Sequence, residues 1–186
     1  IGIEKALSSL KPGRKEYEVV ADFNHALALE NSENAFETIA ASGANACTVH
    51  YVSNQETLKE NELILLDLGA AYHHYCADIS RTFPINGKFT ERQKTFYSIV
   101  LEAQTNVINA IRPVVTMGDL NTIVKQTYAK ACVDAQIVDD PSKIDQVYYH
   151  GVSHFLGLDT HDVGQMDGML LKPGMVITVE PGLYSA

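Results

Sequence analysis

Apolar residues recur along the first part of the chain at the spacing of helices, followed by short strands. Residues 3–10 predict a short amphipathic helix that a Lys-Pro-Gly turn ends, and residues 15–30 predict a longer one lying on a sheet. Residues 37–41 and 48–52 each predict a short strand. In the longer helix, the positions at helical spacing are Tyr17, Val20, Ala21, Asn24, Leu27 and Ala28.

The second half of the chain shows two long helical patterns and ends in an apolar run. Residues 90–111 predict one helix, and residues 117–135 predict another with Asp119 in its first turn, where the helix dipole favours negative charge. Residues 148–162 are dense in His and Gly and predict irregular structure, whereas residues 175–180 predict a buried strand. Because the strands fall in hairpins rather than in βαβ units, we expect an α+β fold with an antiparallel sheet.

The most informative pattern is a predicted β-hairpin over residues 62–84. Residues 63–66 form a continuous apolar run, typical of a strand buried on both faces, and residues 76–83 alternate as a second strand. With a two-residue loop at positions 72 and 73, Asp67 lies directly opposite Asp78, and both carboxylates leave the same face. Two such carboxylates in an apolar sheet are costly to bury unless a positive charge lies between them.

Other roles for these two aspartates stay open at this point. Either could cap a turn, pair with Arg81 or lie at a hairpin edge that faces water. Asp67 follows a run of apolar residues, which favours a buried cation over these alternatives. The position of Asp78 by itself does not decide between them.

Composition narrows the class of protein. The chain of 186 residues is 46% hydrophobic and 20% charged, as expected for one soluble globular domain with a sizeable core. A formal net charge of −9, without a cluster of Lys and Arg, argues against a nucleic-acid partner. No run reaches transmembrane length, which argues against a membrane protein, and three cysteines without CxxC spacing suit a reducing cytoplasm.

Three histidines and a glutamate near the C-terminus form a second group of candidates. His150 and His154 stand four residues apart beside glycines, and His161 follows seven residues later. A lone histidine is usually a hydrogen-bonded core residue, but three in twelve residues are a stronger signal. A zinc HExxH helix is excluded because residue 151 is glycine. Glu180 ends an apolar run before Pro-Gly, as functional residues do, although a glutamate reaching into solvent is the simpler interpretation of that position alone.

Asp67, Asp78, His154 and Glu180 together supply three carboxylates and one imidazole. Donor sets rich in oxygen suit Mn²⁺, Co²⁺, Mg²⁺ or Zn²⁺ better than copper or iron–sulfur chemistry. Several carboxylates that converge also permit two metal ions about 3.5–4 Å apart.

Four motifs, in this order, resemble those of the pita-bread metallopeptidases: THYVSN, LLDLGAAYHHYCADISRTFPINGKFT, YHGVSHFLGLDTHDVG and LKPGMVITVEPGLY. Within that fold the chain is most similar to aminopeptidase P and Xaa-Pro dipeptidase (prolidase), from about residue 35 to residue 184. The resemblance implies a curved antiparallel sheet, helices on its outer face and two divalent metal ions on its concave face. It implies that Asp67 binds one ion, that Asp78 bridges both, and that His154 and Glu180 are further ligands.

The reaction that the resemblance implies is hydrolysis of the peptide bond before proline in a peptide with proline at the second position, with Mn²⁺ first among the candidate ions and Co²⁺ or Zn²⁺ as alternatives. Water activated by the metal attacks the carbonyl carbon, and Glu180 carries the proton to the leaving nitrogen. His150 or His161 donates to the developing oxyanion. Together with His50, these two histidines are expected to line the substrate site, with His50 beside the proline ring.

The fifth metal ligand of the family is a glutamate on the strand after the VEPG motif, and this sequence ends six residues past Glu180 without it. The N-terminal domain common in the family is absent as well. We therefore expect residues 1–186 to be one metallopeptidase catalytic domain, incomplete at its C-terminus, with the last strand missing and a sheet edge exposed. Whether this chain alone is active stays open, and the family resemblance also allows a homodimer.

Other functions were weighed against that of an Xaa-Pro aminopeptidase. Xaa-Pro dipeptidase is the alternative within the family, because the sequence does not show where the pocket closes behind the scissile bond. Methionine aminopeptidase shares the fold and ligand types, but HGVSHFLGLDTHD and residues 81–84 favour the proline-directed branch. A peptide-binding module without catalysis keeps the fold too, but it has no use for four metal ligands.

Overall fold

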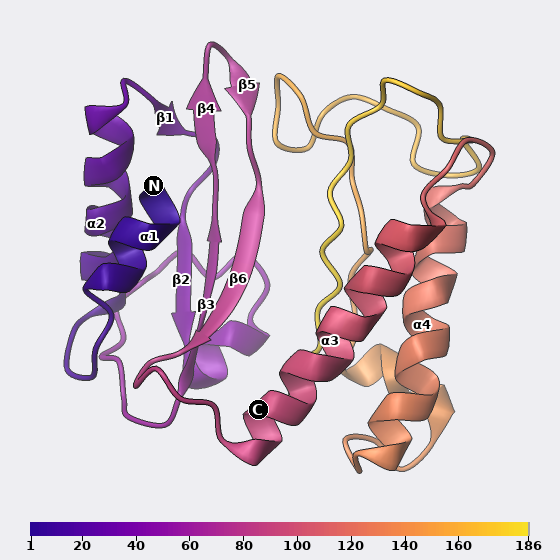
Figure 1. The fold of residues 1–186 in the computed structure, drawn as a ribbon, viewed down its shortest axis with the longest axis horizontal. Helices are drawn as coiled ribbons and strands as arrows, with labels where there is room; N and C mark the ends of the chain where they lie inside the picture. The colour runs from indigo at the N-terminus through magenta and orange to yellow at the C-terminus, as the bar shows by residue number, and fades with distance from the viewer. Residues whose placement is uncertain (186) are drawn as a thin grey trace. The chain divides into compact units, whose positions relative to one another are not determined.

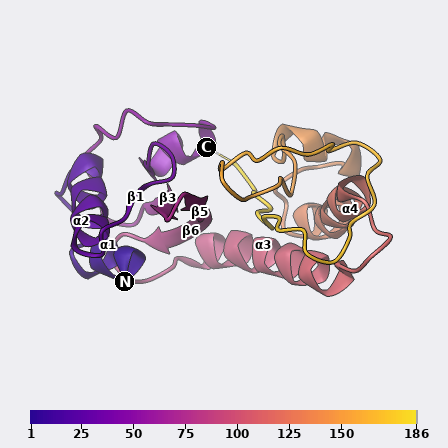
Figure 2. The ribbon, with the colours of Figure 1, turned by 90° about the horizontal axis from the view of Figure 1, so that it is seen from above.

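The computed structural model describes residues 1–185, which form two compact units (Figures 1 and 2). The first unit comprises Ile1–Thr90 together with the short segment Gly157–Thr160. The second comprises Glu91–Leu156 and His161–Ser185. Among the described residues, no helix is both long and apolar enough to cross a membrane.

The first unit combines two helices with antiparallel strands. A sheet in the order β2-β3-β6 carries the two aspartates, and a smaller sheet in the order β1-β4-β5 extends it around the hairpin turn. The elements are α1 (Gly2–Ser8), α2 (Glu16–Leu29), β1 (Glu33–Asn34), β2 (Ile39–Ser42), the 3₁₀ helix η1 (Gly43–Cys47), β3 (Leu63–Leu68), β4 (Ala70–Tyr72), β5 (Tyr75–Cys76) and β6 (Ile79–Pro84).

The core of the first unit lies between its helices and one face of strand β3. Alternate residues of a strand point to opposite faces, so Ile64 and Leu66 reach the side that α1 and α2 cover and are almost fully buried there, with Phe23 of α2 (Figure 1). The residues on the other face of β3, such as Leu65 and Asp67, are only partly buried. The pattern of the apolar run predicted a strand buried on both faces. In the structure, only one face of this strand is fully buried.

Helix α2 has the predicted extent but presents a different face. Its buried residues are Glu16, Val19, Phe23, Ala26 and Leu27, and of the positions picked out from the sequence only Leu27 is among them. The buried stripe begins with a carboxylate, which a search for apolar periodicity does not select.

The hairpin register differs from the predicted one by two residues. Tyr72 pairs with Tyr75, so the two-residue loop is His73–His74, and Asp67 lies opposite Ser80 rather than Asp78. Regular pairing is interrupted beside Gly69, where a Cβ atom would lie 1.8 Å from the carbonyl oxygen of Ala77. Only glycine allows the two backbones to approach this closely. This close approach of Gly69 to Ala77 lies between Asp67 and Asp78 in the sequence.

The strand predicted over residues 48–52 is not formed. Residues 43–47 make the 3₁₀ helix η1, and the chain then runs as a loop to residue 57. The side chain of Asn54 takes the place of a strand beside β2, because its oxygen accepts from the Ala40 backbone N–H at 2.8 Å and its amide donates to the Thr38 carbonyl at 2.9 Å. These side-chain bonds satisfy backbone groups that a neighbouring strand would have bonded.

The second unit is built on two long helices, as predicted. They are α3 (Glu91–Ala110) and α4 (Met117–Asp134), followed by the 3₁₀ helix η2 (Pro141–Gln146). Thr116 and Asp119 form a capping box at the start of α4, which agrees with the expected acidic first turn. The helices pack through Ala103, Val107, Leu120, Val124, Tyr128 and Cys132, all fully buried.

Residues 175–180 pair with residues 152–156 without forming a regular strand. The backbone N–H groups of Leu156, Thr178 and Glu180 donate to the carbonyls of Val176, His154 and Val152, at 3.2, 3.0 and 2.9 Å. A single isolated bridge joins Phe155 to Ile177. The predicted buried strand is thus an extended segment with one partner, and only alternate side chains, such as Ile177 and Val179, pack on the helical core.

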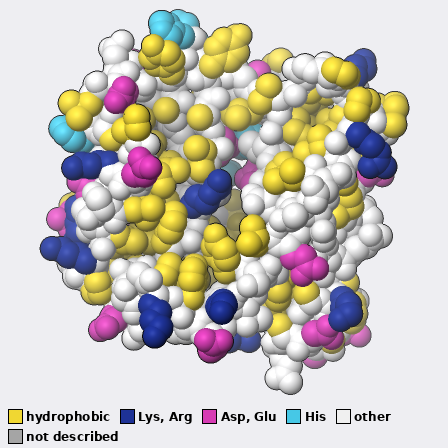
Figure 3. All heavy atoms as spheres, viewed as in Figure 1, with side chains coloured by type: hydrophobic (Ala, Val, Ile, Leu, Met, Phe, Trp, Pro, Cys, Tyr) yellow, Lys and Arg dark blue, Asp and Glu magenta, His cyan; other side chains and the backbone are white. Residues whose placement is uncertain are grey.

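The α+β class and the antiparallel sheets agree with the sequence-based prediction. Charges are spread over the visible face in Figure 3, where Lys and Arg lie between acidic and apolar side chains instead of forming one patch.

Stability of the second unit is expected to fall in alkali because of a buried thiol. Burial raises the pKa of Cys132 from 9.0 to about 11. Below pH 9 the thiol is neutral in both states; between pH 9 and 11 only the unfolded chain releases the proton, so unfolding becomes more favourable as pH rises. Urea unfolding at pH 8 and pH 10.5 should show a smaller fall for Cys132→Ala than for the wild type. An equal fall would assign the loss to the buried tyrosines Tyr128 and Tyr148, which both proteins share.

Candidate metal centre

In the second unit, the paired segments bring His154 and Glu180 together. His154 Nε2 lies 3.0 Å from Glu180 Oε1, and both side chains are mostly buried. His154 Nδ1 lies 2.9 Å from the carbonyl oxygen of Phe155, which can only accept, so Nδ1 carries a proton. Nε2 then faces the carboxylate, and two acceptor atoms at this distance need either a shared proton or a metal ion between them.

Thr178 fixes both members of this pair. Its hydroxyl oxygen accepts from the His154 backbone N–H at 3.0 Å, and the hydroxyl donates to Glu180 Oε1 at 2.9 Å. The threonine is itself buried. Sequence reasoning did not select Thr178, although it stands two residues before Glu180 in an extended segment and so belongs to the same face.

His161 and His150 have different surroundings. The His161 ring lies edge-to-face against that of His154, with centroids 4.5 Å apart, and its side chain is exposed. His150 lies in a cluster of tyrosines, where its Nε2 is 2.8 Å from the Tyr184 hydroxyl and its ring meets that of Tyr148 at 5.5 Å. The structure therefore brings His161 beside His154 and places His150 in the tyrosine cluster.

Tyr148 stays neutral in this cluster. Burial, and then the negative charge of Glu180, raise the pKa of the Tyr148 hydroxyl well above its usual range. Its hydroxyl donates to Asn121 Oδ1 at 2.5 Å. Tyr148 can therefore donate a hydrogen bond at neutral pH but cannot act as a base.

The two aspartates and His50 belong to the first unit. Asp67 lies on β3 and accepts a hydrogen bond of 2.8 Å from the Ser80 hydroxyl, while Asp78 lies in the short stretch between β5 and β6. Both aspartates are partly buried. His50 is exposed in the loop after η1, with a left-handed backbone at φ 57°.

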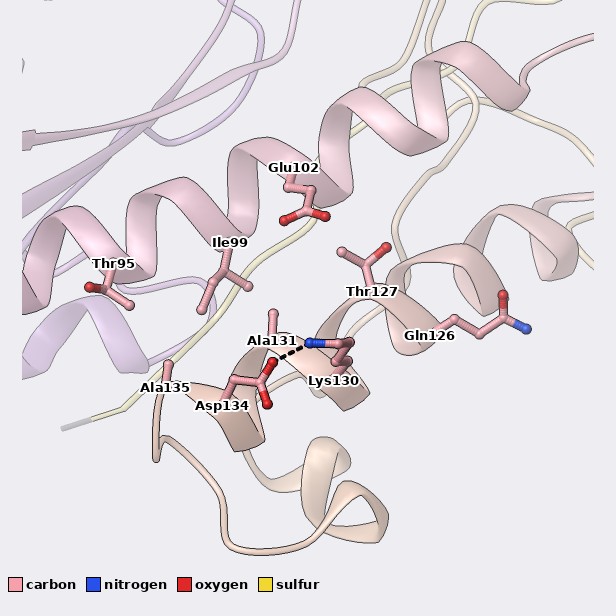
Figure 4. Close-up of a pocket in the computed structure, with 9 residues that line it drawn as sticks. All are labelled: Thr95, Ile99, Glu102, Gln126, Thr127, Lys130, Ala131, Asp134 and Ala135. Atoms are coloured by element: carbon pink, nitrogen blue, oxygen red, sulfur yellow. Dashed lines mark hydrogen bonds and ion pairs between the residues drawn. The ribbon is translucent and has the colours of Figure 1, made fainter.

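Within residues 1–185, no three His, Cys, Asp or Glu side chains are placed so that they could hold one metal ion. Of the four candidate ligands, His154 and Glu180 are in direct contact. A groove of about 540 Å³ lies elsewhere, between α3 and α4, where Figure 4 shows Ile99 and Glu102 facing Thr127, Lys130 and Asp134. It contains none of the candidate residues.

Solved structures place the chain in a known fold class. A zinc-substituted aminopeptidase P of Escherichia coli in complex with product matches all of this chain with a TM-score of 0.96 and 35% identity, over 44% of that chain. The chain therefore has the pita-bread fold of that class of metallopeptidases. Residues 1–186 match the model of metallopeptidase family M24, and the chain belongs to this family.

Curated relatives agree with this assignment. An Xaa-Pro aminopeptidase of Haemophilus influenzae is 38% identical over 99% of this chain and 45% of its own length. An Xaa-Pro dipeptidase of Pyrococcus horikoshii is 34% identical over 96% of this chain and 49% of its own length. The chain thus spans about half the length of the curated relatives it matches.

The residues present fit divalent metals. His154 offers a bare ring nitrogen whose other nitrogen is held by a carbonyl, the arrangement usual for a metal-binding imidazole. Two ligands held at about 2.1 Å by one ion lie about 3 to 3.4 Å apart, and the observed separation of 3.0 Å falls in this range. Thr178 supplies the second hydrogen bond that orients the carboxylate.

Proposed function

We propose that the protein to which this chain belongs is a metal-dependent exopeptidase that hydrolyses the peptide bond before proline, of the Xaa-Pro aminopeptidase type. The observation that carries the proposal is the pair His154–Glu180, whose facing atoms, 3.0 Å apart, are held at the separation of two ligands of one metal ion. Family membership supports peptide hydrolysis, and the named relatives support a proline-directed specificity.

The proposed metal ligands are Asp67, Asp78, His154 and Glu180, with a further glutamate that lies outside this sequence. Two divalent ions are proposed, Mn²⁺ first, with Co²⁺ or Zn²⁺ as alternatives; a zinc-substituted relative has been solved. Carboxylate-rich donor sets with one imidazole suit all three. When bound, such ions polarise the substrate carbonyl and lower the pKa of a water molecule.

Residues of this chain would carry the protons. Glu180, held by Thr178, accepts the proton of the attacking water and passes it to the leaving nitrogen, which lacks an N–H when proline follows the scissile bond. His161, whose ring contacts that of His154, or else His150 would donate to the developing oxyanion. His150, held by Tyr184, lines the substrate site, and His50 borders the proline ring.

The test compares an Xaa-Pro-Xaa tripeptide and an Xaa-Pro dipeptide as substrates of the full-length protein, first stripped of metal and then with Mn²⁺ restored. Release of the first residue from the tripeptide, dependent on Mn²⁺, is the expected result. Cleavage of the dipeptide alone would identify a dipeptidase. Absence of cleavage of both, with metal bound in calorimetry, would contradict the proposal and favour a peptide-binding module of the same fold.

Removal of the Thr178 hydroxyl is expected to weaken metal binding without unfolding the protein. Thr178→Val keeps the shape but removes the hydrogen bonds to His154 and Glu180, and such supporting groups typically change metal affinity by about 10- to 100-fold. Titration of Mn²⁺ into the full-length protein measures the change. Thr178→Ser keeps the hydroxyl and is the control; equal affinities for Val and Ser variants would contradict the assigned role.

Three further proposals concern the whole protein. Residues 1–186 are proposed to be part of one catalytic domain. A reducing cytoplasm is proposed as its location, supported by Cys47, Cys76 and Cys132, none of which forms a disulfide within residues 1–185. A homodimer is proposed from the family resemblance alone, and sedimentation of the full-length protein tests it.

A further inference from the structure

A buried carboxylate stands at the start of α2, in the first unit, apart from the proposed metal ligands. The Glu16 side chain has no exposed surface. Its Oε1 accepts from the backbone N–H and the hydroxyl of Ser42, both at 2.7 Å, and from Asn45 Nδ2 at 3.4 Å. Its Oε2 accepts from the Tyr51 hydroxyl and from the Glu56 backbone N–H, both at 2.9 Å.

These donors keep Glu16 ionised. Burial by itself raises the pKa of the carboxyl, but the hydrogen bonds from Ser42, Glu56 and Tyr51 together lower the pKa below its usual value. A buried charge is tolerated only when it is compensated in this way. All of the donors come from one stretch of chain, residues 42–56, which runs from the end of β2 through η1 into the loop.

This stretch forms no strand after Ser42, and backbone bonds from the Glu16 and Tyr17 N–H groups to the Glu56 and Asn54 carbonyls hold only its end, so side chains hold the rest. The Glu16 carboxylate accepts hydrogen bonds from Ser42 and Glu56, near the two ends of the stretch, and from Tyr51. The Asn54 side chain accepts from the Ala40 backbone N–H and so joins the stretch to β2. His50 lies next to Tyr51 and has a left-handed backbone, a conformation that a residue other than glycine keeps only when its surroundings impose it.

We propose that Glu16 is a positioning residue for the substrate site, because it fixes the segment 42–56 and thereby holds His50 where the proline ring binds. The inference deepens the proposed function and rests on it for the role of His50. Glu16 itself is not placed in contact with substrate. Its contribution passes through Tyr51, whose hydroxyl it holds one residue away from the histidine.

The geometry also shows why glutamine cannot replace Glu16. Each of the two carboxylate oxygens accepts from a backbone N–H, Oε1 from Ser42 and Oε2 from Glu56. Whichever way a glutamine amide is turned, its NH₂ group faces one of these donors, and that N–H loses its acceptor. The isosteric change should therefore loosen one end of the segment.

The main test is kinetic and uses the full-length protein loaded with Mn²⁺ and an Xaa-Pro-Xaa tripeptide. Glu16→Gln is expected to raise KM about tenfold, because the substrate binds more weakly when His50 is displaced. It should change kcat less than threefold, because the proton carrier Glu180 stays in place. Glu18→Gln is the matched control: it alters a carboxylate in the same helical turn, which bonds only the Lys15 backbone N–H in the capping box, and KM should stay within twofold.

A double-mutant cycle separates positioning from a general structural effect. In a His50→Ala background, Glu16→Gln should raise KM no further, since the group through which it acts has been removed. An equal rise in KM with and without His50 would overturn the proposal. A KM within twofold of wild type for the single variant Glu16→Gln would overturn it as well.

A second measurement does not depend on the reaction. Amide hydrogen exchange over residues 48–56 should speed up at least tenfold in Glu16→Gln, while exchange in α4 stays unchanged. If the wild type cleaves no Xaa-Pro peptide, the proposed function fails, yet this exchange still decides whether Glu16 holds the segment. Unchanged exchange over residues 48–56 would overturn the inference even in an active enzyme.

Discussion

Replacement of Glu180 by glutamine is expected to lower kcat for Xaa-Pro-Xaa hydrolysis by about 10²- to 10⁴-fold, the usual contribution of a positioned acid–base group. The amide keeps the size of the side chain but loses both the negative charge and the ability to take up a proton. Its effect also reaches His154, because the variant removes the charge that faces Nε2 at 3.0 Å. Steady-state kinetics in saturating Mn²⁺ measure the loss separately from weaker metal binding.

Glu102→Gln provides the control for this experiment. Glu102 lies on α3 at the groove shown in Figure 4, where its loss of charge touches none of the proposed ligands. Its kcat should stay within twofold of the wild type. Turnover of Glu180→Gln within tenfold of wild type, with Mn²⁺ bound, would rule out Glu180 as the proton carrier.

Replacement of Gly69 by alanine is expected to destabilise the first unit by at least about 3 kcal/mol, at the upper end of the cost of forcing extra atoms into a packed site. The new methyl carbon would lie 1.8 Å from the Ala77 carbonyl oxygen and 2.9 Å from the ring of Phe36. The closer atom belongs to the backbone, so a rotamer change cannot relieve the clash. Thermal unfolding should show a melting temperature lower by roughly 6–12 °C.

Gly118→Ala is the matched control, since a Cβ there would meet only the Thr116 hydroxyl oxygen at an ordinary 3.6 Å. Gly118 lies in the first turn of α4, where alanine is the better helix former by up to about 1 kcal/mol, so this variant should melt at the same temperature or higher. If Gly69→Ala had the same melting temperature as the wild type, the prediction would be wrong, and the backbones at residues 69 and 77 could move apart at little cost.

The helices of the second unit could be predicted almost to the residue. Long segments with capping signals, such as α4 with its Thr116–Asp119 box, specify their own ends. Helix α2 was predicted in extent but not in orientation, because its buried stripe starts at Glu16, and only the three-dimensional network shows that this charge is satisfied. The prediction of a strand over residues 48–52 was wrong for a similar reason. The Asn54 side chain hydrogen-bonds the Ala40 backbone N–H, at the edge of β2 with which such a strand would have paired.

The candidate residues were selected from sequence patterns and from the family resemblance, but the sequence did not predict how they are arranged. The sequence placed Asp67 opposite Asp78, but a loop shifted to His73–His74 pairs Asp67 with Ser80. A shift of two residues keeps the alternation of faces, which is why the apolar pattern could not detect it. The contact between His154 and Glu180 joins segments 26 residues apart, and only the backbone pairing around Thr178 defines it.

Segment Gly157–Thr160 belongs to the first unit although the residues on either side of it belong to the second. Its Gly157 carbonyl accepts from the Cys76 backbone N–H at 2.8 Å, and Thr160 donates to the Ala35 carbonyl at 3.2 Å. During synthesis, the hydrogen bond from Cys76 to Gly157 therefore cannot form until about 80 further residues, including both long helices, have left the ribosome. Such long loop closures slow folding, so helices α3 and α4 are expected to form first and the hairpin that carries Asp78 to become protected last.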